Sequence, residues 1–520
     1  MMIHIVMVRQ TKGDCIEEER KALLQIKASH IKTYDSDFSP TWVDYGECCD
    51  WERVSCNTTT AHVTHLSLGG LDVQFGSKLW ALNVSLFLHF KELRSLNLSN
   101  DFLDKEIIKT GLERLSSLKK LEVLDLSLND DIDNDILPSL TTLTSLKILD
   151  LSYTSLNGNF RISDFSALEN LEMLDLTGCD FNGAFEIEGS ERVSLLKKLK
   201  TLNLANNGFN ESVITSLNTL SSLTNLDLSG NYFTGSFSAQ DFAALENLEM
   251  LDLSGCGFSG TFEIEGSERA SIFRKLRTLN LGWNQFNESV ITSLKTLPSL
   301  TNLDLSENYF TGPFPAQELS HLTNLEELDL RSTQLNDTPN IQACKTLSRL
   351  KRLVTINLSE NNLNESIMPC LSVLPSLKIL HLTGSFSWGS SFPVQGFLNF
   401  SDLEVLLLND NGFIGTIPME AFASFPNLEV LDLSRNSFVG SIPSTIQLLS
   451  SLRALSFAGN NLNGSLPDPG LCELKNLLEL DLSSNMLHGT LPQCLENLSS
   501  LKLLDISSNR FTGILLLLRS

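Results

Sequence analysis

A single phrase recurs along almost the whole chain, and it limits the possible folds more than any other feature. The phrase is L-x-x-L-x-L-x-x-N-x-(L/F), and most copies start 24 to 28 residues after the previous one. The copies begin at Val63 (a degenerate one), Leu93, Leu121, Leu146, Leu171, Leu199, Leu223, Leu248, Leu276, Leu300, Leu325, Leu353, Leu377, Leu403, Leu428, Leu452, Leu477 and Leu501. A unit this short cannot bury its leucines alone, so successive units must stack into one continuous core. The sequence therefore predicts a solenoid of about eighteen coils over residues 63–518, in place of the three or four domains that 520 residues would otherwise suggest.

Within the phrase, leucines alternate with polar residues, as in Leu124-Asp125-Leu126. Alternate residues of a strand point to opposite faces, so the leucines face the core and Asp125 faces outward. Asparagine at the ninth position stands where the chain turns off the strand, and there a buried amide can bond the backbone of its own and of the adjacent coil. Cys179 and Cys256 occupy the same position. The pattern predicts an α/β repeat fold, a right-handed solenoid with a parallel β-sheet on its concave face.

A second phrase, (L/F)-x-G-x-(I/L/F)-P, follows the first in the later coils, as at Phe413–Pro418. Glycine permits a bend there, and proline ends the extended segment without wasting a backbone donor. This phrase resembles the plant-specific class of leucine-rich repeat. A longer period is also present, because a block of three coils is duplicated, and its segments 185–192 and 262–269 are expected on the convex side.

Residues 14–58 precede the coils and are predicted to cap their open end. Apolar residues at helical spacing follow an acidic first turn between Cys15 and Lys27. A cysteine-rich segment, C-C-D-W-E-R-V-S-C, then spans Cys48 to Cys56. The four cysteines of this region allow three pairings. A zinc site is the alternative, and it is disfavoured because no histidine stands at ligand spacing.

The cap motif C-C-x-W-x-x-V-x-C resembles the N-terminal cap of plant leucine-rich-repeat receptors and inhibitors. From Cys15 to about Leu515, the chain resembles plant receptor-like proteins. The resemblance implies a leucine-rich-repeat solenoid with a disulfide-linked N-terminal cap. It also implies that Cys15 pairs with Cys48 and that Cys49 pairs with Cys56.

Two further disulfides are expected from position alone. Cys472 and Cys494 lie at similar offsets in adjoining coils, and Cys344 and Cys370 repeat the arrangement. The ends depart from the family, because the chain has none of its island segment, C-terminal cap, membrane span or short tail. Residues 1–13 are interpreted as a signal-peptide remnant or an unstructured segment. We therefore expect a truncated extracellular region.

Charge and sequons address the compartment and the partners. With a net charge of −24, the chain repels phosphate backbones and is expected to bind no nucleic acid. No stretch reaches the eighteen or so apolar residues of a membrane span. The candidate N-glycosylation sites are Asn57, Asn83, Asn210, Asn287, Asn336, Asn364, Asn399, Asn463 and Asn497. Two other sequons, at Asn97 and Asn357, project from the strand face, where a glycan would block binding.

Sequons and cap cysteines together favour the secretory route. The destination is the extracellular side of the plasma membrane if the full-length protein has a span, and otherwise the extracellular space or the cell wall. A cytosolic location fits the missing signal but leaves the paired-cysteine cap unexplained. No nucleophile elbow, phosphate loop, zincin phrase or kinase phrase is present, and the one near pair of histidines, His62 and His65, is interpreted as structural. We expect a non-enzyme with no cofactor and no metal.

Ligand binding is expected on the concave face, where many coils present side chains in register. The aspartate that recurs at the outward strand position is most simply a solvated consensus residue. Departures from this consensus are more informative, because aromatic and arginine side chains anchor interfaces. For each departure singly, the alternative is neutral drift in a duplicated array. The candidate ligand-binding residues are Trp283, Arg331, His381, Asp304, Glu307, Tyr153 and Arg435.

Two functions from different classes fit these features. One is a recognition ectodomain that resembles receptor-like proteins, binds a peptide or protein ligand in defence or development, and signals through a partner co-receptor kinase. The other is a soluble secreted inhibitor of a cell-wall-degrading enzyme, similar to polygalacturonase-inhibiting proteins. Length favours the receptor, because the inhibitors have fewer coils. The identity of the ligand does not follow from the sequence.

Overall fold

The computed structural model describes residues 15–34, 40–70, 80, 82–100, 103–182, 196–260, 262–263, 273–336 and 340–513. The chain divides into two compact units. The first comprises residues 1–234, 240–252 and 271–273, and the second comprises residues 235–239, 253–270 and 274–520. Three predicted parts lie outside the described residues: segment 1–13, interpreted as a signal-peptide remnant or an unstructured segment, the last predicted coil residues, 514–518, and most of the two segments expected on the convex side.

The cap combines helix α1 (Glu17–Tyr34) with strand β1 (Val54–Cys56), which pairs antiparallel with the first repeat strand, β2 (Val63–Ser67). Leu23 and Ile26 of α1 are buried, as their helical spacing predicts. The buried carboxylate of Glu19 accepts a hydrogen bond from the Val63 backbone N–H at 2.8 Å, and its other oxygen lies 2.8 Å from His62 Nδ1. These contacts fasten α1 to the edge of the repeat sheet.

Two disulfides hold the cap, Cys15–Cys48 and Cys49–Cys56, each with Cα atoms 5.5 Å apart. This is the pairing that the family resemblance implies, and a disulfide-linked cap is confirmed. Inside the cap, the indole rings of Trp42 and Trp51 stack with centroids 5.7 Å apart.

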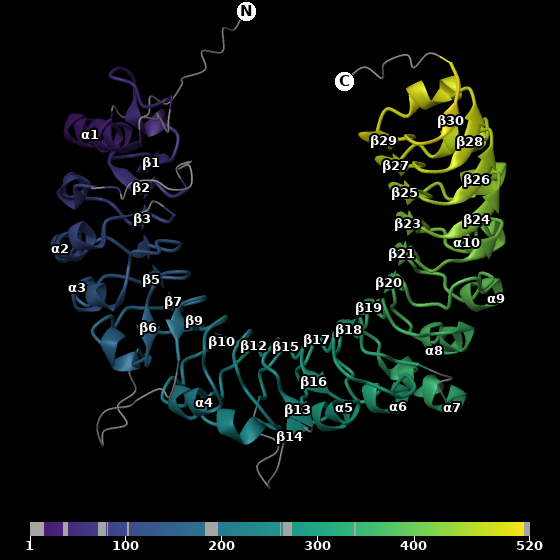
Figure 1. Ribbon diagram of the computed structural model, residues 1–520, viewed down its shortest axis with the longest axis horizontal. Helices are drawn as coiled ribbons and strands as arrows, with labels where there is room; N and C mark the ends of the chain where they lie inside the picture. Colours follow the sequence, from purple (N-terminus) through teal and green to yellow (C-terminus); the bar gives the residue numbers. More distant parts are fainter. Residues whose placement is uncertain are drawn as a thin grey trace, which may run out of the picture. The chain divides into compact units, whose positions relative to one another are not determined.

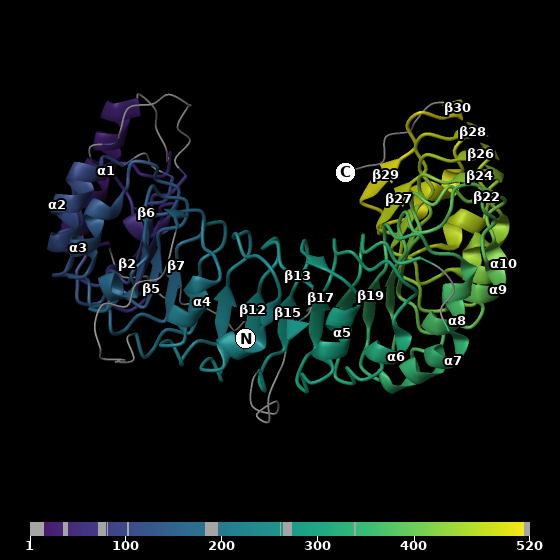
Figure 2. The same ribbon diagram turned by 60° about the horizontal axis from the view of Figure 1, so that its bottom comes forward.

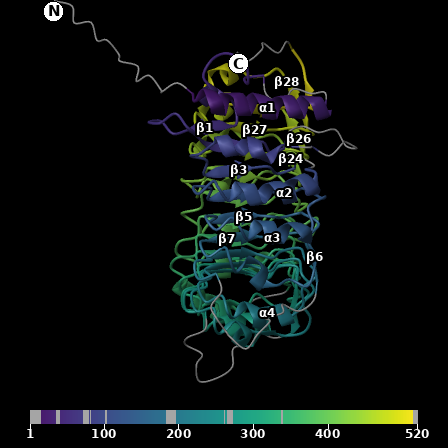
Figure 3. The same cartoon turned by 90° about the vertical axis from the view of Figure 1, so that its left-hand side faces the viewer.

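The repeat strands of the first unit are short, because each consists of the central residues of one copy of the phrase. They pair parallel and in register, leucine beside leucine. These strands are β2, β3 (Ser95–Asn97), β4 (Val123–Asp125), β5 (Ile148–Asp150), β7 (Met173–Asp175), β9 (Thr201–Asn203), β10 (Asn225–Asp227) and β12 (Met250–Asp252). Helices α2 (Lys105–Leu115), α3 (Leu137–Leu140) and α4 (Ser212–Leu217) lie on the opposite side of the coils, in successive layers with α1 (Figure 3). Two minor strands, β6 (Asn157–Gly158) and β8 (Asp180–Phe181), pair with each other.

The second unit repeats this plan. Its inner strands are β15 (Thr278–Asn280), β17 (Asn302–Asp304), β18 (Glu327–Asp329), β19 (Thr355–Asn357), β20 (Ile379–His381), β21 (Val405–Leu407), β23 (Val430–Asp432), β25 (Ala454–Ser456), β27 (Glu479–Asp481) and β29 (Leu503–Asp505). They line the inner side of this unit's curve, and the helices lie on the outer side (Figure 1). The helices are α5 (Ser289–Leu294), α6 (Ala316–Leu319), α7 (Ile341–Cys344), α8 (Met368–Leu371), α9 (Val394–Phe397) and α10 (Met419–Phe422).

Small sheets run beside the main ladder. The second phrase forms a five-stranded one from β22 (Ile414–Gly415), β24 (Ser437–Gly440), β26 (Asn461–Gly464), β28 (Met486–Gly489) and β30 (Arg510–Phe511) (Figure 2). Its glycines have positive φ, for example 98° at Gly415, which is why this position needs glycine. Two strand pairs, β11 (Phe237–Ser238) with β14 (Phe262–Glu263) and β13 (Ser259–Gly260) with β16 (Gln285–Phe286), complete the described strands.

The asparagine column binds successive coils together, as predicted. Asn436 is buried, and its Nδ2 donates to the carbonyls of Leu408, Leu433 and Ser434 at 2.9, 3.0 and 3.2 Å. Its Oδ1 accepts from the Phe413 backbone N–H at 3.0 Å. One side chain thus satisfies backbone groups of two coils. The leucine-rich-repeat solenoid is confirmed, and none of the helices in the described part of the chain is long and apolar enough to cross a membrane.

Candidate recognition surface

The outward strand position has a structural task that explains why aspartate recurs there. In the second unit, Asp432 Oδ1 accepts a hydrogen bond from the Ser434 backbone N–H at 2.8 Å, and other coils repeat the bond. The aspartate therefore closes the turn that follows each strand. Asparagine does the same, since Asn357 Oδ1 accepts from the Ser359 N–H at 3.1 Å and its Nδ2 donates to Asp329 at 2.9 Å. The recurrence of aspartate at this position is therefore explained by the structure of the coil and does not by itself indicate a binding site.

Stacking carboxylates on a partly buried sheet has an electrostatic cost. Burial raises the pKa of Asp150 and of Asp227 above the ordinary value, and nearby aspartates of the same column add to both shifts. Burial likewise raises the pKa of Asp329, with Asp304 contributing. His381, in the same column, has its pKa lowered by burial, so its imidazole is neutral at neutral pH. The inner face is therefore a surface on which an added cation is favourable.

A second column lies one residue before the asparagine, and its backbone is left-handed throughout. Glycine fills this position in several coils, for example Gly230 (φ 65°) and Gly459 (φ 63°). Trp283 occupies it with φ 55°. A Cβ atom in this conformation costs roughly 1–2 kcal/mol, and Trp283 shares that cost with the other residues at this position that are not glycine, among them Leu128 and Arg435. Trp283 is nevertheless 63% exposed, so burial in the chain's own core does not account for it.

Tyr153 occupies the same left-handed position in the first unit, but it has a packing partner. A Cβ atom on Gly178 of the next coil would lie 2.5 Å from the Tyr153 ring, so the ring covers that glycine. At the same position, the coil that follows Trp283 carries Glu307 and not glycine. The structure therefore separates two candidates that look alike in the sequence.

The arginine candidates are partly neutralised within the chain. Arg331 Nη2 lies 3.1 Å from Glu307 Oε1, and its Nε lies 4.0 Å from Glu360 Oε1. The hydrogen bond to Glu307 is the main cause that raises the pKa of Arg331. Arg435 is more exposed, and its Nη1 lies 3.9 Å from Asp410 Oδ1. Trp283, Glu307 and Arg331 follow one another on successive coils, whereas His381 and Arg435 lie further along the same unit.

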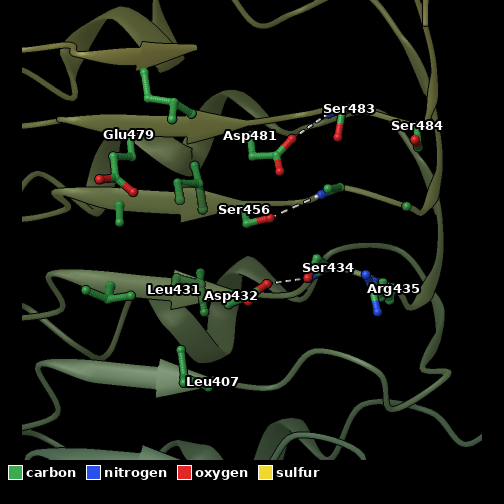
Figure 4. A pocket seen from close by; sticks show the side chains of 16 residues that line it. Leu407, Leu431, Asp432, Ser434, Arg435, Ser456, Glu479, Asp481, Ser483 and Ser484 are labelled. Atoms are coloured by element: carbon green, nitrogen blue, oxygen red, sulfur yellow. Dashed lines mark hydrogen bonds between the residues drawn. The ribbon is translucent and has the colours of Figure 1, made fainter. Parts of the chain in front are cut away.

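A hollow of about 580 Å³ lies on the inner face around strands β23, β25 and β27 (Figure 4). Asp432, Ser456 and Asp481 follow one another across it on successive strands, with Glu479 on the strand of Asp481 and Arg435 at the edge (Figure 4). The hollow exists because the coil of β25 carries small residues where its neighbours carry larger ones. This hollow was not predicted from the sequence, although the signal is present in the residues Ala454, Ser456, Ala458 and Gly459.

Five of the candidate glycosylation asparagines share a third position, three residues after the turn residue of the coil, and all five are exposed: Asn210, Asn287, Asn336, Asn364 and Asn463. Asn57, Asn83 and Asn399 are exposed elsewhere, and nothing is described of the Asn497 side chain. In the second unit the same position carries three exposed apolar residues, Trp388, Ile414 and Val439. These, with the exposed Tyr232 and Tyr309, were not among the predicted site residues. Glycosylation itself stays a prediction.

The cysteines outside the cap fasten neighbouring coils on their outer side. Cys344 of α7 pairs with Cys370 of α8, and Cys472 pairs with Cys494. Among the described residues, two groups bring three possible metal-ligand atoms together, Cys15 with Cys48 and Cys49, and Asp468 with Cys472 and Cys494, and the cysteines of both groups are in disulfides. Cys179 and Cys256 form no disulfide and are buried in the asparagine column.

Comparison with known proteins agrees with this architecture. The leucine rich repeat family model matches residues 197–258, 274–335 and 401–462, and further leucine rich repeat models match 117–140 and 476–498. The leucine rich repeat N-terminal domain matches residues 16–57. The chain therefore belongs to the leucine-rich-repeat proteins and carries their plant-type N-terminal domain.

Within that family the chain is homologous to plant receptor-like proteins. It is 32% identical to "Receptor-like protein 13" of Arabidopsis thaliana over 327 residues, which are 62% of this chain and 24% of that protein. The chain thus spans about a quarter of the length of this relative.

Among solved structures, the chain resembles the ectodomain of the plant membrane receptor kinase GASSHO1/SCHENGEN3 from Arabidopsis thaliana in complex with Casparian strip integrity factor 2. The TM-score is 0.55 at 24% identity, and the match covers 94% of this chain and 64% of that one. A TDR receptor matches with a TM-score of 0.51 at 26% identity, over 77% and 71% of the two chains. These likenesses establish the fold.

Proposed function

We propose that this chain is the non-enzymatic recognition region of a plant receptor-like protein that reaches the cell surface through the secretory route. It binds a peptide or protein ligand on the inner strand face of the second unit and passes the signal through a partner kinase. Homology to receptor-like proteins supports the class, and the complex of the GASSHO1/SCHENGEN3 ectodomain with its factor supports a bound ligand by analogy of fold.

The exposure of the Trp283 side chain is the main support for this proposal. Trp283 keeps a large apolar surface in water, and it does so at a backbone position that favours glycine. Neither property helps the coil, so contact with a partner is the simplest compensation. Glu307 and Arg331 on the next two coils offer a paired anion and cation beside it. An aromatic anchor bordered by charges is a common composition for the centre of a protein interface.

The test is capture of extracellular plant proteins and peptides by the purified chain, comparing wild type with Trp283→Ala. An anchor residue contributes about 2 kcal/mol or more, which is about thirtyfold in affinity. The matched control is Ile341→Ala, because Ile341 is also 63% exposed but lies in α7 on the outer side. We expect Trp283→Ala to lose the ligand and Ile341→Ala to keep it, with unchanged melting curves for both.

Two results would overturn the proposal. Undiminished capture by a folded Trp283→Ala variant would remove Trp283 from the site. Capture of a secreted cell-wall-degrading enzyme, with loss of that enzyme's activity, would move the chain to the inhibitor class. The signalling step is tested separately, by asking whether a membrane kinase co-purifies with the ligand-bound chain and not with Trp283→Ala.

A further inference from the structure

The hollow on the inner face places two carboxylates on either side of a serine. In the register of the parallel ladder, Asp432 pairs with Ser456 and Ser456 pairs with Asp481. Adjacent strands are about 4.8 Å apart, so the two aspartates stand about 9.6 Å apart across the strand of Ser456. Their side chains point to the same side of the sheet as Ser456 (Figure 4).

The gap at Ser456 differs from the other interruptions of the aspartate column in the described strands. Ser67 also interrupts the column, but it lies on the first repeat strand, which has another repeat strand on one side only. At the other interruptions the residue is larger than serine. Asn203 donates to Asp175 at 2.6 Å, and Asn357 donates to Asp329 at 2.9 Å. Ser456 is shorter, and its Oγ instead accepts from the backbone N–H of its own turn at Ala458, at 3.4 Å. The donor that bridges neighbouring coils elsewhere is therefore missing here.

The charge in the hollow is not balanced by the chain. Oδ1 of Asp432 and Oδ1 of Asp481 each accept a backbone N–H, at 2.8 and 2.9 Å, and within the described part of the chain no hydrogen bond uses the second oxygen of either carboxylate. Glu479 adds a third carboxylate to the lining. Among the described residues, no cation lies within ion-pair distance of these three groups, and Arg435 at the edge lies near Asp410 instead.

We infer that the hollow receives the guanidinium group of an arginine side chain of the ligand, seated over Ser456 between Asp432 and Asp481. This inference rests on the proposed function and names the chemistry of one ligand residue. A guanidinium is planar and has donors on opposite edges, so it can reach both carboxylates at once. Leu407 and Leu503 line the hollow at its two ends and suit the aliphatic stem. A lysine ammonium is a single point and cannot span the gap in the same way.

The probe is an array of 12-residue peptides, each with one arginine, lysine or citrulline in an otherwise neutral sequence. Citrulline keeps the shape of arginine and removes its charge. We expect arginine peptides to bind at least about tenfold more tightly than their citrulline counterparts, as a charge-assisted contact should. Arginine peptides that bind no better than citrulline peptides would overturn the inference, and equal binding of lysine peptides would overturn the bridging geometry.

The variants are Asp432→Asn with Asp481→Asn, and Ser456→Asn, which supplies the filling residue found at Asn357. The exchanges are compatible with the fold because asparagine already closes the same turn in other coils. Both should weaken the best arginine peptide at least about tenfold and leave its citrulline version within about twofold, which is the signature of a direct pair in a double-mutant cycle. The control is Asp150→Asn, the same strand position in the first unit, which should change neither.

Failure of this inference is distinguishable from failure of the proposed function. If arginine and citrulline peptides bind alike while Trp283→Ala still abolishes capture of the natural ligand, the hollow is not an arginine site and the recognition surface stands. If the arginine preference is present but Ser456→Asn and the double aspartate variant leave it unchanged, the cation binds elsewhere and the assignment to this hollow is wrong. Loss of the preference in the Asp150→Asn control would equally contradict it.

Discussion

Replacing Trp283 by alanine and by glycine tests whether its backbone is strained. In either variant the indole is lost, so the two differ only by a Cβ atom. At φ 55° that atom costs about 1–2 kcal/mol in the folded state. Glycine in turn lowers the free energy of unfolding by about 0.5–1 kcal/mol relative to alanine, because the unfolded chain has greater conformational freedom at a glycine. The difference predicts that Trp283→Gly is more stable than Trp283→Ala by about 0.5–1 kcal/mol, although glycine is normally the destabilising residue.

The assay combines denaturant unfolding with hydrogen exchange at the Trp283 amide, which donates to the Ser306 carbonyl at 2.9 Å. Hydrogen exchange is needed because a repeat protein can open locally without unfolding as a whole. The matched control is the same pair of exchanges at Thr292, an exposed position inside α5, where alanine should be more stable than glycine by about 1 kcal/mol. Equal stability of the two Trp283 variants, or the ordinary order with alanine ahead, would refute the argument from strain and weaken the case for Trp283 as a retained anchor.

Three further outcomes follow from the contacts described above. Asn436→Ala removes four hydrogen bonds to two coils, so we expect the free energy of unfolding to fall by about 1–3 kcal/mol. Because each coil contacts only its neighbours, hydrogen exchange should become faster only in residues 428–450, and an even rise along the chain would contradict this. Cys56→Ser opens a cap disulfide and should lower stability by about 2–5 kcal/mol together with the secreted yield, whereas unchanged melting would show that the cap does not depend on it. The pKa of Asp227 is raised in the folded state, so its contribution to stability is present at acid pH and is lost as the pH rises through that raised value. Denaturant midpoints measured across this pH range should therefore depend less on pH in Asp227→Asn than in the wild type. An identical dependence would show that Asp227 is not the source of the pH dependence.

The coil was predictable from the sequence because its rules are local and repeated. Alternation fixes which residues face the core, and the buried asparagine satisfies the same backbone groups in each coil that carries it. Asn436 is representative, since its bonds to two coils follow from its position in the phrase alone. The cap disulfides followed from family resemblance, because spacing left three pairings open.

The site was less predictable because it depends on what stands beside each residue. Tyr153 and Trp283 occupy equivalent positions, and the difference between them lies in the next coil, where one ring covers Gly178 and the other has no such partner at that position. From the sequence alone, Arg331 is a candidate interface anchor, but its contacts with Glu307 and Glu360 partly neutralise its charge within the chain. The hollow around Ser456 is produced by residues that are small relative to their neighbours, so no single residue in the sequence marks it.

The most direct test of the recognition surface is hydrogen exchange of the second unit with and without the captured ligand. We expect protection in the segments that carry β15 to β27, including Trp283 and the turn after it, and we expect the outer helices α5 to α10 to exchange as in the free chain. Protection confined to those outer helices, with the inner strands unchanged, would contradict the claim that the inner face binds the ligand.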